Sequence, residues 1–589
     1  MARQDPHSYT DLEQGRLTDV AFHLRVDFAE KRLRGHARLT LEAPTSGTLD
    51  LDARDLAIER VCTVDGDAIP YTLADADAVL GSKLSVTLPM GTAAFDVFYA
   101  TSPEASALQW LAPSQTAGGE HPYLFSQCQA IHARALAPLQ DTPRARIRFE
   151  AEIEVDKPLR VVMAASMDGE KPGSSDASST WLFHMPQPIP PYLIALAAGN
   201  IQAQEVGPRS AVYAEPEVLE KAAWEFGGVE DMITTAEGLF GPYPWERFDL
   251  LCMPPSFPYG GMENPRLTFL TPTLLAGDRS QVNVVAHELA HSWTGNLVTN
   301  ADMEHFWLNE GFTVYAERRI LEALEGKEFV ALHAAIGRAG LAREVKRFGV
   351  DSPYTRLRTE LQGVDPDEVF SLVPYEKGFL LVRLIHETVG QQRFDVFLKA
   401  YIEKFRFQSI TTEQWEEFVE AQLPGVLKQV DAEAWLRSSG VPANEPTFAS
   451  DRKVAVDRLA AGWGEGKRPT QELVAAWSPE EWLLYLQGLP KEIDVTDCEA
   501  LDKAFGLTAQ GNSEIQVEWL GIGVTSGYGP AIDRACAFLE EMGRMKYLKP
   551  LYSVLAANPD TKERARALFT KVKPTYHPIA QMAVESVLK

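Results

Sequence analysis

Residues 287–291 read His-Glu-Leu-Ala-His, and this pattern constrains the fold of the chain more than any other segment. They lie in a stretch from about 282 to 295 whose apolar residues recur with helical spacing, which predicts a helix. Because side chains four residues apart share one helix face, His287 and His291 can bind the same metal ion while Glu288 lies beside it. Two hydrogen-bonded helix histidines without an ion are the alternative interpretation of this segment alone.

A catalytic zinc ion takes three protein ligands and keeps one position open for water, so a third ligand should follow the histidines. Glu310 lies 19 residues after His291, and Gly295 between them predicts the turn that lets a second helix return to the ion. The sequence therefore predicts one zinc ion per chain, bound by His287, His291 and Glu310. Glu317, two helical turns past Glu310, is a candidate acceptor for the free N–H of a ligand imidazole. This spacing resembles that of the gluzincin metallopeptidases.

The same residues predict the chemistry of a hydrolase. Zinc lowers the pKa of a bound water molecule to about 7, so a hydroxide nucleophile is available at neutral pH. Glu288 would act as general base: it accepts the proton as water attacks a carbonyl carbon and returns it to the leaving amine. These residues fit an endopeptidase similar to thermolysin as well as an aminopeptidase, so the choice between the two depends on other segments.

Residues 259–264 read Tyr-Gly-Gly-Met-Glu-Asn and resemble the Gly-x-Met-Glu-Asn motif of peptidase family M1, the aminopeptidase N type. Glycines leave room for a peptide backbone to approach, and a carboxylate beside them can bind a free α-ammonium group. An ordinary turn is the alternative for the paired glycines. The resemblance implies substrate-binding roles for Tyr259, Gly260, Gly261, Met262 and Glu263.

Further segments narrow the resemblance to one branch of that family, the leukotriene A(4) hydrolases and their bacterial aminopeptidase relatives, over nearly the whole chain. Residues 125–130, Phe-Ser-Gln-Cys-Gln-Ala, match the branch's amine-binding segment, which implies that Gln129 helps Glu263 to bind the substrate N-terminus. Residues 374–378, Pro-Tyr-Glu-Lys-Gly, match the segment whose tyrosine donates a hydrogen bond to the tetrahedral oxyanion, which implies that role for Tyr375.

Three further positions concern the substrate pocket. Asp367 matches an aspartate that lines the pocket in this branch, and together with Gln127 it would suit an Arg or Lys first residue. Arg544 and Lys546 match a segment that binds a substrate carboxylate, which implies a preference for short free peptides. Phe370 departs from the branch, because leukotriene A(4) hydrolase has a tyrosine there, near its lipid-epoxide site.

The expected function is that of a zinc metalloaminopeptidase that hydrolyses the first residue from short peptides. A bifunctional enzyme that also hydrolyses a leukotriene A(4)-type epoxide is the alternative, and Phe370 weighs against it. A noncatalytic peptide-binding protein of the same fold is a second alternative. The intact metal ligands, base and tyrosine oppose it.

The length of 589 residues predicts several domains. Period-two patterns, as in residues 147–155, indicate an N-terminal β domain, and helical patterns at 530–542 and 561–572 indicate a C-terminal helical domain. The family resemblance implies a multidomain α+β protein with an antiparallel β saddle, a thermolysin-like gluzincin domain and an α-helical superhelix, and an active site between them. The predicted divisions are 1–206 (β domain), 207–443 (zinc catalytic domain), 444–470 (linker) and 471–589 (helical domain).

The composition bears on partners and location. A net charge of −26 would repel nucleic acids and anionic membranes and favour cationic substrates, although acidity that only aids solubility is the simpler alternative. No stretch approaches the ~20 apolar residues of a membrane helix, and the first residues lack the apolar run of a secretory signal. Five scattered cysteines fit reduced thiols better than a disulfide framework. A cytoplasmic monomer acting on peptides, without nucleic-acid or membrane partners, is expected.

Overall fold

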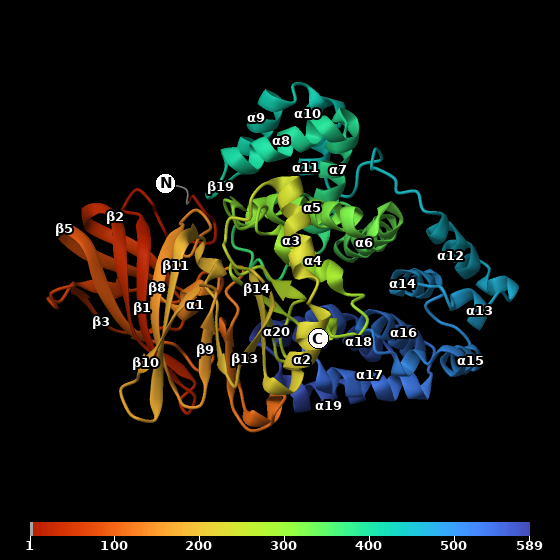
Figure 1. The fold of residues 1–589 in the computed structure, drawn as a ribbon, viewed down its shortest axis with the longest axis horizontal. Coiled ribbons are helices and arrows are strands. Elements are labelled where there is room, and N and C mark those ends of the chain that lie inside the picture. The colour runs from red at the N-terminus through yellow and green to blue at the C-terminus, as the bar shows by residue number, and fades with distance from the viewer. Residues whose placement is uncertain (1–3, 589) are drawn as a thin grey trace.

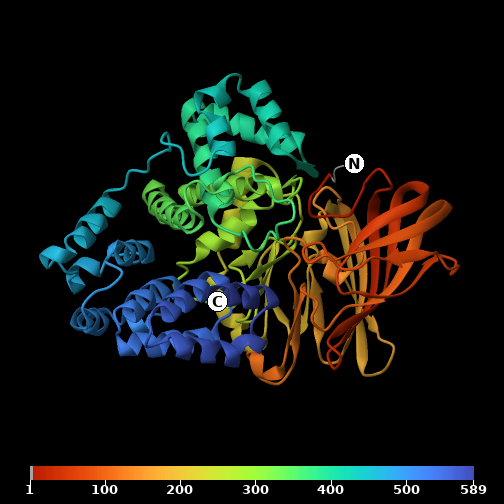
Figure 2. The ribbon, with the colours of Figure 1, turned by 180° about the vertical axis from the view of Figure 1, so that it is seen from behind.

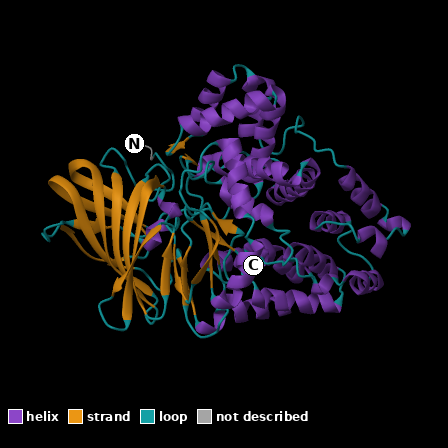
Figure 3. Cartoon of the chain, in the orientation of Figure 1, coloured by secondary structure: helices purple, strands orange, loops and turns teal. Residues whose placement is uncertain are grey.

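The computed structural model describes residues 4–588. Strands gather at one end of the molecule and helices at the other (Figures 1 and 3). Three lobes follow one another along the chain: an N-terminal β lobe, a central lobe around α4 (Val282–Ala290) and α5 (Trp307–Glu325), and a C-terminal helical lobe. The view from behind shows the same three lobes (Figure 2). This is the α+β architecture that the sequence predicted.

The largest sheet has eight strands in the order β10-β11-β8-β1-β2-β5-β3, with β4 paired to β5. Alternate side chains of β8 are buried, as its period-two pattern predicted. The predicted antiparallel arrangement has one exception: β8 lies parallel to β1, because it reaches that strand through the long connection 28–146, and a parallel pair requires such a crossover. The strands are β1 (Leu17–Asp27), β2 (Arg32–Ala53), β3 (Ala57–Thr63), β4 (Tyr71–Leu73), β5 (Ser82–Ala100), β8 (Ile147–Asp156), β10 (Ser166–Pro172) and β11 (Ser178–Ile189).

Two smaller sheets lie between this β lobe and the helices. One has the order β6-β7-β12-β9, and the other, β13-β14-β15-β17-β16, leaves β16 at an edge beside α4. An edge strand has unpaired backbone groups that an extended peptide can use. The strands are β6 (Leu108–Leu111), β7 (Tyr123–Ser126), β9 (Arg160–Met163), β12 (Leu196–Gly199), β13 (Gln202–Gly207), β14 (Ser210–Ala214), β15 (Asp249–Cys252), β16 (Gly261–Met262) and β17 (Leu267–Leu270).

The central lobe packs helices around α5, most of whose residues are buried. A helix that is buried on most of its circumference can hold polar side chains in a fixed position, because its neighbours restrict their rotamers. The remaining elements before residue 440 are α1 (Ala133–Leu136), α2 (Pro216–Glu225), α3 (Val229–Phe240), β18 (Val298–Asn300), α6 (Lys327–Phe348), α7 (Gly378–Val389), α8 (Gln391–Lys404), β19 (Gln408–Ile410), α9 (Thr412–Gln422), α10 (Val426–Gln429) and α11 (Ala432–Arg437).

The C-terminal lobe is helical and has a hydrophobic core of its own. Two of its helices, α17 and α19, coincide with the helical patterns of the sequence, and α12 lies inside the expected linker. The divisions near residues 206, 443 and 470 stay a prediction. The helices are α12 (Asp451–Ala461), α13 (Gln471–Val474), α14 (Pro479–Gly488), α15 (Val495–Phe505), α16 (Ser513–Thr525), α17 (Gly529–Glu541), α18 (Met545–Ala557), α19 (Lys562–Val572) and α20 (Pro578–Leu588).

The N-terminal and central lobes share one continuous hydrophobic core. Arg146 of the β lobe also forms hydrogen bonds to the central lobe. Its guanidinium donates to the carbonyl oxygens of Asn296 at 3.0 Å and Gln408 at 3.2 Å. Because Asn296 follows the end of α4, this contact fixes the histidine-bearing helix relative to the β lobe. Among residues 4–588, none of the helices combines the length and the apolar composition needed to cross a bilayer.

Candidate active site

His287, His291 and Glu310 meet between α4 and α5. His287 lies in the last turn of α4, His291 caps that helix, and Glu310 lies in the first turn of α5. The two imidazole Nε2 atoms are 3.2 Å apart, and Glu310 Oε2 lies 3.4 Å from His287 Nε2 and 3.6 Å from His291 Nε2. Ligands of a tetrahedral zinc ion, each about 2.0–2.1 Å from the metal, lie about 3.3 Å apart, so these distances suit one ion.

The chemistry of this donor set also fits a metal ion. Glu310 Oε2 is buried and accepts no hydrogen bond from the described residues. A buried carboxylate oxygen without a partner is costly, and a cation would satisfy it. Glu263 and Glu288 also bring donor atoms near His291, but only the first set combines two imidazoles of one helix with this unpartnered oxygen.

Hydrogen bonds on the far side of each ring set the proton positions of the two histidines. His287 Nδ1 lies 3.0 Å from Glu317 Oε2, so Glu317 lies where the sequence predicted an acceptor. His291 Nδ1 lies 3.2 Å from the carbonyl oxygen of Thr294, which can only accept. Each Nδ1 therefore faces an acceptor, so Nε2 is the nitrogen of each ring that would bind a metal.

One neighbour of the histidines, Thr313, was not identified from the sequence. Thr313, which is one turn past Glu310 on the same face of α5, places Oγ1 3.2 Å from His291 Nδ1. Its position three residues after Glu310 could have predicted that it shares a helix face with that ligand. Gly295 has φ +124°, and a Cβ there would lie 2.5 Å from His291 Nδ1 and from Asn309 Oδ1. The predicted turn thus requires glycine for conformational and steric reasons.

Buried carboxylates dominate the electrostatics of the site. Burial raises the pKa of Glu288 to about 8, the positive charge of His287 opposes the rise, and Glu310 adds to it. Burial also raises the pKa of Glu263 well above its usual range, with repulsion from Glu310 and Glu288. For His287, burial lowers the pKa, but the neighbouring carboxylates of Glu310 and Glu317 outweigh burial and raise it. So many buried carboxylates require cations, such as a metal ion and an ammonium group.

The motif at 259–264 lies against these carboxylates. Glu263 directly follows the edge strand β16, and Gln129 Nε2 donates to Glu263 Oε1 at 3.2 Å. A Cβ at Gly261 would lie 2.2 Å from Glu288 Oε1, and one at Gly260 would lie 2.6 Å from Arg544 Nη2. The sequence attributed the glycines to the approach of a peptide backbone. In the structure, the side chains of Glu288 and Arg544 occupy part of the space beside these two glycines.

Tyr375 lies beside the candidate metal ligands on a single π-helical turn, η6 (Val373–Lys377). Its ring stacks on that of His287, with centroids 6.0 Å apart, and Phe370 packs against it at 6.0 Å. Burial, with the negative charges of Glu310 and Glu263, raises the pKa of the phenol well above its usual value. The hydroxyl therefore stays protonated and can donate a hydrogen bond.

The structure places the predicted carboxylate-binding pair in two environments. Arg544 is buried, and its Nη1 donates to Thr273 Oγ1 at 3.0 Å and to the Tyr547 hydroxyl at 2.8 Å. Its Nε is buried and has no partner among the described residues, and Nη2 lies toward Gly260. Lys546 is exposed and pairs with Glu514 Oε1 at 2.7 Å, and Arg544 Nη1 lies 3.6 Å from the same oxygen. Only Arg544 therefore joins the cluster around Glu288.

The two predicted pocket residues also differ in their surroundings. Gln127 is buried, and its Nε2 lies 3.1 Å from the Sδ of Met262, the residue before Glu263. Gln127 Oε1 has no partner among the described residues. Asp367 pairs with His132 at 2.7 Å. The structure therefore brings together all of the predicted residues around the metal ligands and the motif, with Lys546 at the margin.

Comparisons with known proteins agree with this geometry. The Peptidase M1 N-terminal domain model matches residues 6–193, the Peptidase family M1 domain model 224–435, and the model of the leukotriene A4 hydrolase C-terminal domain 477–588. The chain is similar to leukotriene A-4 hydrolase of Xenopus laevis, with 39% identity over 98% of each chain. It is 37% identical to leucine aminopeptidase 2 of Yarrowia lipolytica, over 100% of this chain and 94% of the relative.

A solved structure matches the whole fold as well. It is that of yeast LTA4 hydrolase in complex with bestatin, with a TM-score of 0.92 and 33% identity, over 100% of this chain and 97% of that one. The match extends from the β lobe to the C-terminal helices, so the three-lobed fold class predicted from the sequence is confirmed.

Proposed function

Since this chain belongs to the leukotriene A(4) hydrolase branch of peptidase family M1 and is a metalloaminopeptidase, we propose that it removes the first residue from short free peptides. One zinc ion per chain would be held by His287, His291 and Glu310. The observation that carries the proposal is the buried Glu263 carboxylate, which lies at the edge strand β16 and beside the three metal-binding side chains. A peptide whose first ammonium group pairs with Glu263 would present its first peptide bond to those side chains.

The residues around the ligands each have a role in this proposal. When bound, zinc supplies Lewis-acid activation of water and of the peptide carbonyl. Glu288 accepts a proton from the attacking water and returns it to the leaving amine. The Tyr375 hydroxyl donates a hydrogen bond to the oxyanion that develops on the carbonyl oxygen. Gln129 holds Glu263 Oε1 by its hydrogen bond, and the free backbone groups of β16 align the substrate as an added strand.

Hydrolysis of a lipid epoxide is the second candidate activity, because one relative is named leukotriene A-4 hydrolase. One observation favours a peptidase without it: Phe370, which has no hydroxyl group, packs on Tyr375. Efficient conversion of leukotriene A(4) to its dihydroxy acid by the purified enzyme would contradict this interpretation.

We also propose that the enzyme acts as a monomer in the cytoplasm. All five cysteines are buried and free, which supports a reducing compartment. The Coulomb field of a chain with net charge −26 disfavours nucleic acids and anionic lipids and supports peptides as the partners.

A panel of aminoacyl fluorogenic substrates, assayed with and without a chelator, tests the proposed function. We expect turnover that is lost when zinc is removed and restored by stoichiometric zinc, together with a higher melting temperature of the zinc-loaded protein, because a ligand that binds only the folded state stabilises it. Full turnover by a preparation that metal analysis shows to be zinc-free would exclude the proposed metal site.

Arg544 predicts a preference for peptides with a free C-terminus. Its unpartnered Nε and its Nη2 face the site and can bind a carboxylate with two hydrogen bonds. A peptide of about three residues, ~10 Å when extended, would reach both Glu263 and Arg544. We expect kcat/KM of a tripeptide to exceed that of its C-terminal amide by about tenfold or more.

The Arg544→Ala variant should lose this difference between acid and amide. An aminoacyl fluorogenic substrate, which has no terminal carboxylate, serves as the control for general damage, and its kcat/KM should stay near the wild-type value. Equal kcat/KM for the acid and the amide in the wild type would remove the carboxylate site from the proposal.

A further inference from the structure

The segment 359–367, here called the Asp367 loop, lies between the short helix η5 (Pro353–Thr355) and η6 and contains no helix or strand. Its position therefore depends on contacts with other parts of the molecule. Glu304 of the central lobe provides one of them, since its Oε1 accepts from the Leu361 amide at 2.8 Å. Two more come from the N-terminal lobe, and both are made by histidine rings.

The first of these rings is His132, which precedes α1. Its Nε2 lies 2.7 Å from Asp367 Oδ2. The His132 side chain is 2% exposed and that of Asp367 is 12% exposed. A contact this short between buried partners, from lobes more than two hundred residues apart in the chain, restricts the rotamer of the aspartate.

The other nitrogen of His132 identifies its tautomer. His132 Nδ1 lies 2.8 Å from Ser106 Oγ and 3.4 Å from Arg54 Nη1. A guanidinium group only donates, so Nδ1 acts as acceptor and carries no proton. The single ring proton is then on Nε2 and is donated to Asp367 Oδ2. Asp367 Oδ1 accepts no hydrogen bond among the described residues, and it remains available to a ligand.

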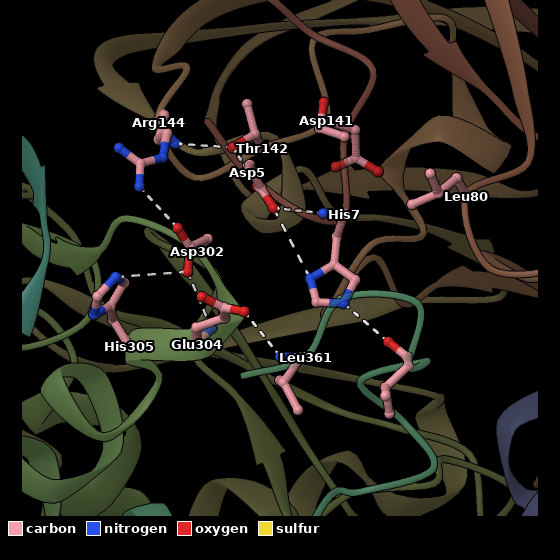
Figure 4. A network of polar contacts seen from close by, with 12 residues as sticks. Asp5, His7, Leu80, Asp141, Thr142, Arg144, Asp302, Glu304, His305 and Leu361 are labelled. Atoms are coloured by element: carbon pink, nitrogen blue, oxygen red, sulfur yellow. Dashed lines mark hydrogen bonds and ion pairs between the residues drawn. The ribbon is translucent and has the colours of Figure 1, made fainter. Parts of the chain in front are cut away.

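The second ring is His7, near the start of the described chain. Its Nε2 lies 2.9 Å from the carbonyl oxygen of Val364, which is within the Asp367 loop. Figure 4 shows the His7 ring with Asp5 beside it, and the hydrogen bond from the Leu361 amide to Glu304. Asp5 accepts from the His7 amide at 2.8 Å and from Thr142 Oγ1 at 2.6 Å, so the N-terminal segment is itself fixed to the β lobe.

Phe370, three residues after Asp367, packs on Tyr375, so this end of the segment lies against the candidate active site. Burial raises the pKa of the Tyr259 phenol well above its usual value, and the charges of Asp367, Asp365 and Glu263 contribute. Tyr259 begins the motif that contains Glu263, and its ring packs on Phe370, 5.9 Å between centroids. Asp367 and Glu263 are therefore neighbours of one tyrosine.

We propose that His132 and His7 are positioning residues for substrate specificity: they hold the Asp367 loop against the N-terminal lobe, so that Asp367 Oδ1 faces the cationic side chain of an Arg or Lys first residue. This inference rests on the proposed aminopeptidase function. His132 orients the carboxylate itself, and His7 holds the backbone three residues before it. Neither imidazole touches the reacting atoms in this proposal.

The test compares two aminoacyl fluorogenic substrates, one with Arg and one with Ala as the only residue, in zinc-loaded enzyme. We expect His132→Phe, which keeps a ring but loses the donor, to raise KM for the Arg substrate by about tenfold and to leave kcat for the Ala substrate within about twofold. His132→Gln, which retains an N–H donor, should restore the Arg preference. His7→Ala should shift KM in the same direction by less.

Reference variants make the outcome specific. Asp367→Asn should reduce the Arg preference as much as His132→Phe does, and the double variant should lose nothing more, because both changes remove one interaction. His184 lies 2.7 Å from Asp168 on the N-terminal sheet, far along the chain from the loop. His184→Phe removes an equivalent His–Asp contact and should leave both substrates unchanged.

Several results would overturn the inference. The first is that His132→Phe raises KM equally for the Arg and the Ala substrate. The second is that His132→Gln does not restore the Arg preference. The third is that the wild type has no Arg preference and that Asp367→Asn changes KM for neither substrate. Each of these leaves cleavage of the Ala substrate in the wild type, so the proposed aminopeptidase function would stand. Absence of cleavage of either substrate by zinc-loaded wild type would instead remove the function on which the inference rests.

Discussion

The Glu288→Gln variant is expected to bind zinc as the wild type does and to lose about 10²–10⁴ in kcat, the usual contribution of a general base. Glutamine has nearly the same shape as glutamate, which matters because Glu288 Oε1 lies only 2.2 Å from the position of a Cβ at Gly261. Its amide cannot accept the proton of the attacking water. The three proposed metal ligands are unchanged.

Two measurements on the same preparation decide this prediction: zinc per chain by elemental analysis, and kcat at saturating substrate. Glu215→Gln is a matched control, because Glu215 is also a buried carboxylate but accepts from the Ala117 amide, away from the metal ligands. Its kcat should match that of the wild type. If Glu288→Gln kept wild-type kcat with stoichiometric zinc, the assignment of the general base would be wrong.

A blocked N-terminus should reduce cleavage severely. We expect kcat/KM for an N-acetylated tripeptide to be about 10²–10³ lower than for the free peptide, because the Glu263 carboxylate would lose its charged partner inside the site. Burial and the neighbouring Glu310 and Glu288 already disfavour the ionised form of Glu263. An ammonium group offsets that repulsion, whereas an acetylated nitrogen does not.

The Glu263→Gln variant separates this effect from simple steric exclusion of the acetyl group. Its kcat/KM for the free peptide should fall. The ratio of kcat/KM for the free peptide to kcat/KM for the acetylated peptide should therefore be smaller than in the wild type. The Gln129 amide would keep an acceptor in this variant, since the glutamine side chain retains one oxygen. Equal cleavage of free and acetylated peptides by the wild type would contradict the aminopeptidase assignment and favour endopeptidase action.

Local patterns predicted a large part of the candidate site. His287 and His291 share a helix face because backbone geometry alone brings residues four apart together, and Glu317 lies two turns past Glu310 for the same reason. The helix itself ends at Ala290 rather than near Gly295, since the chain turns to pair the Gly295 amide with the Val298 carbonyl. Helix boundaries depend on such turns and are less predictable than helix faces.

Family resemblance extended the prediction to residues that no local rule connects. Gln129 and Glu263 are 134 residues apart in the chain, and their contact follows from neither periodicity nor spacing. Tyr375 was assigned from a five-residue match, whereas its position over His287 depends on a π-helical turn that the sequence did not predict. The match identified the residues but not the geometry that brings them together.

By itself, the sequence determined the residues and helix face of the predicted metal site, since both are properties of short segments. Only the tertiary structure decided which distant groups meet there: Arg544 beside Gly260, and His132 on Asp367. It also showed that Lys546 and Arg544 share Glu514, with Lys546 exposed and Arg544 buried. The physical reason is that side-chain directions within a helix follow from its fixed rise and turn, whereas contacts between lobes depend on how whole surfaces pack.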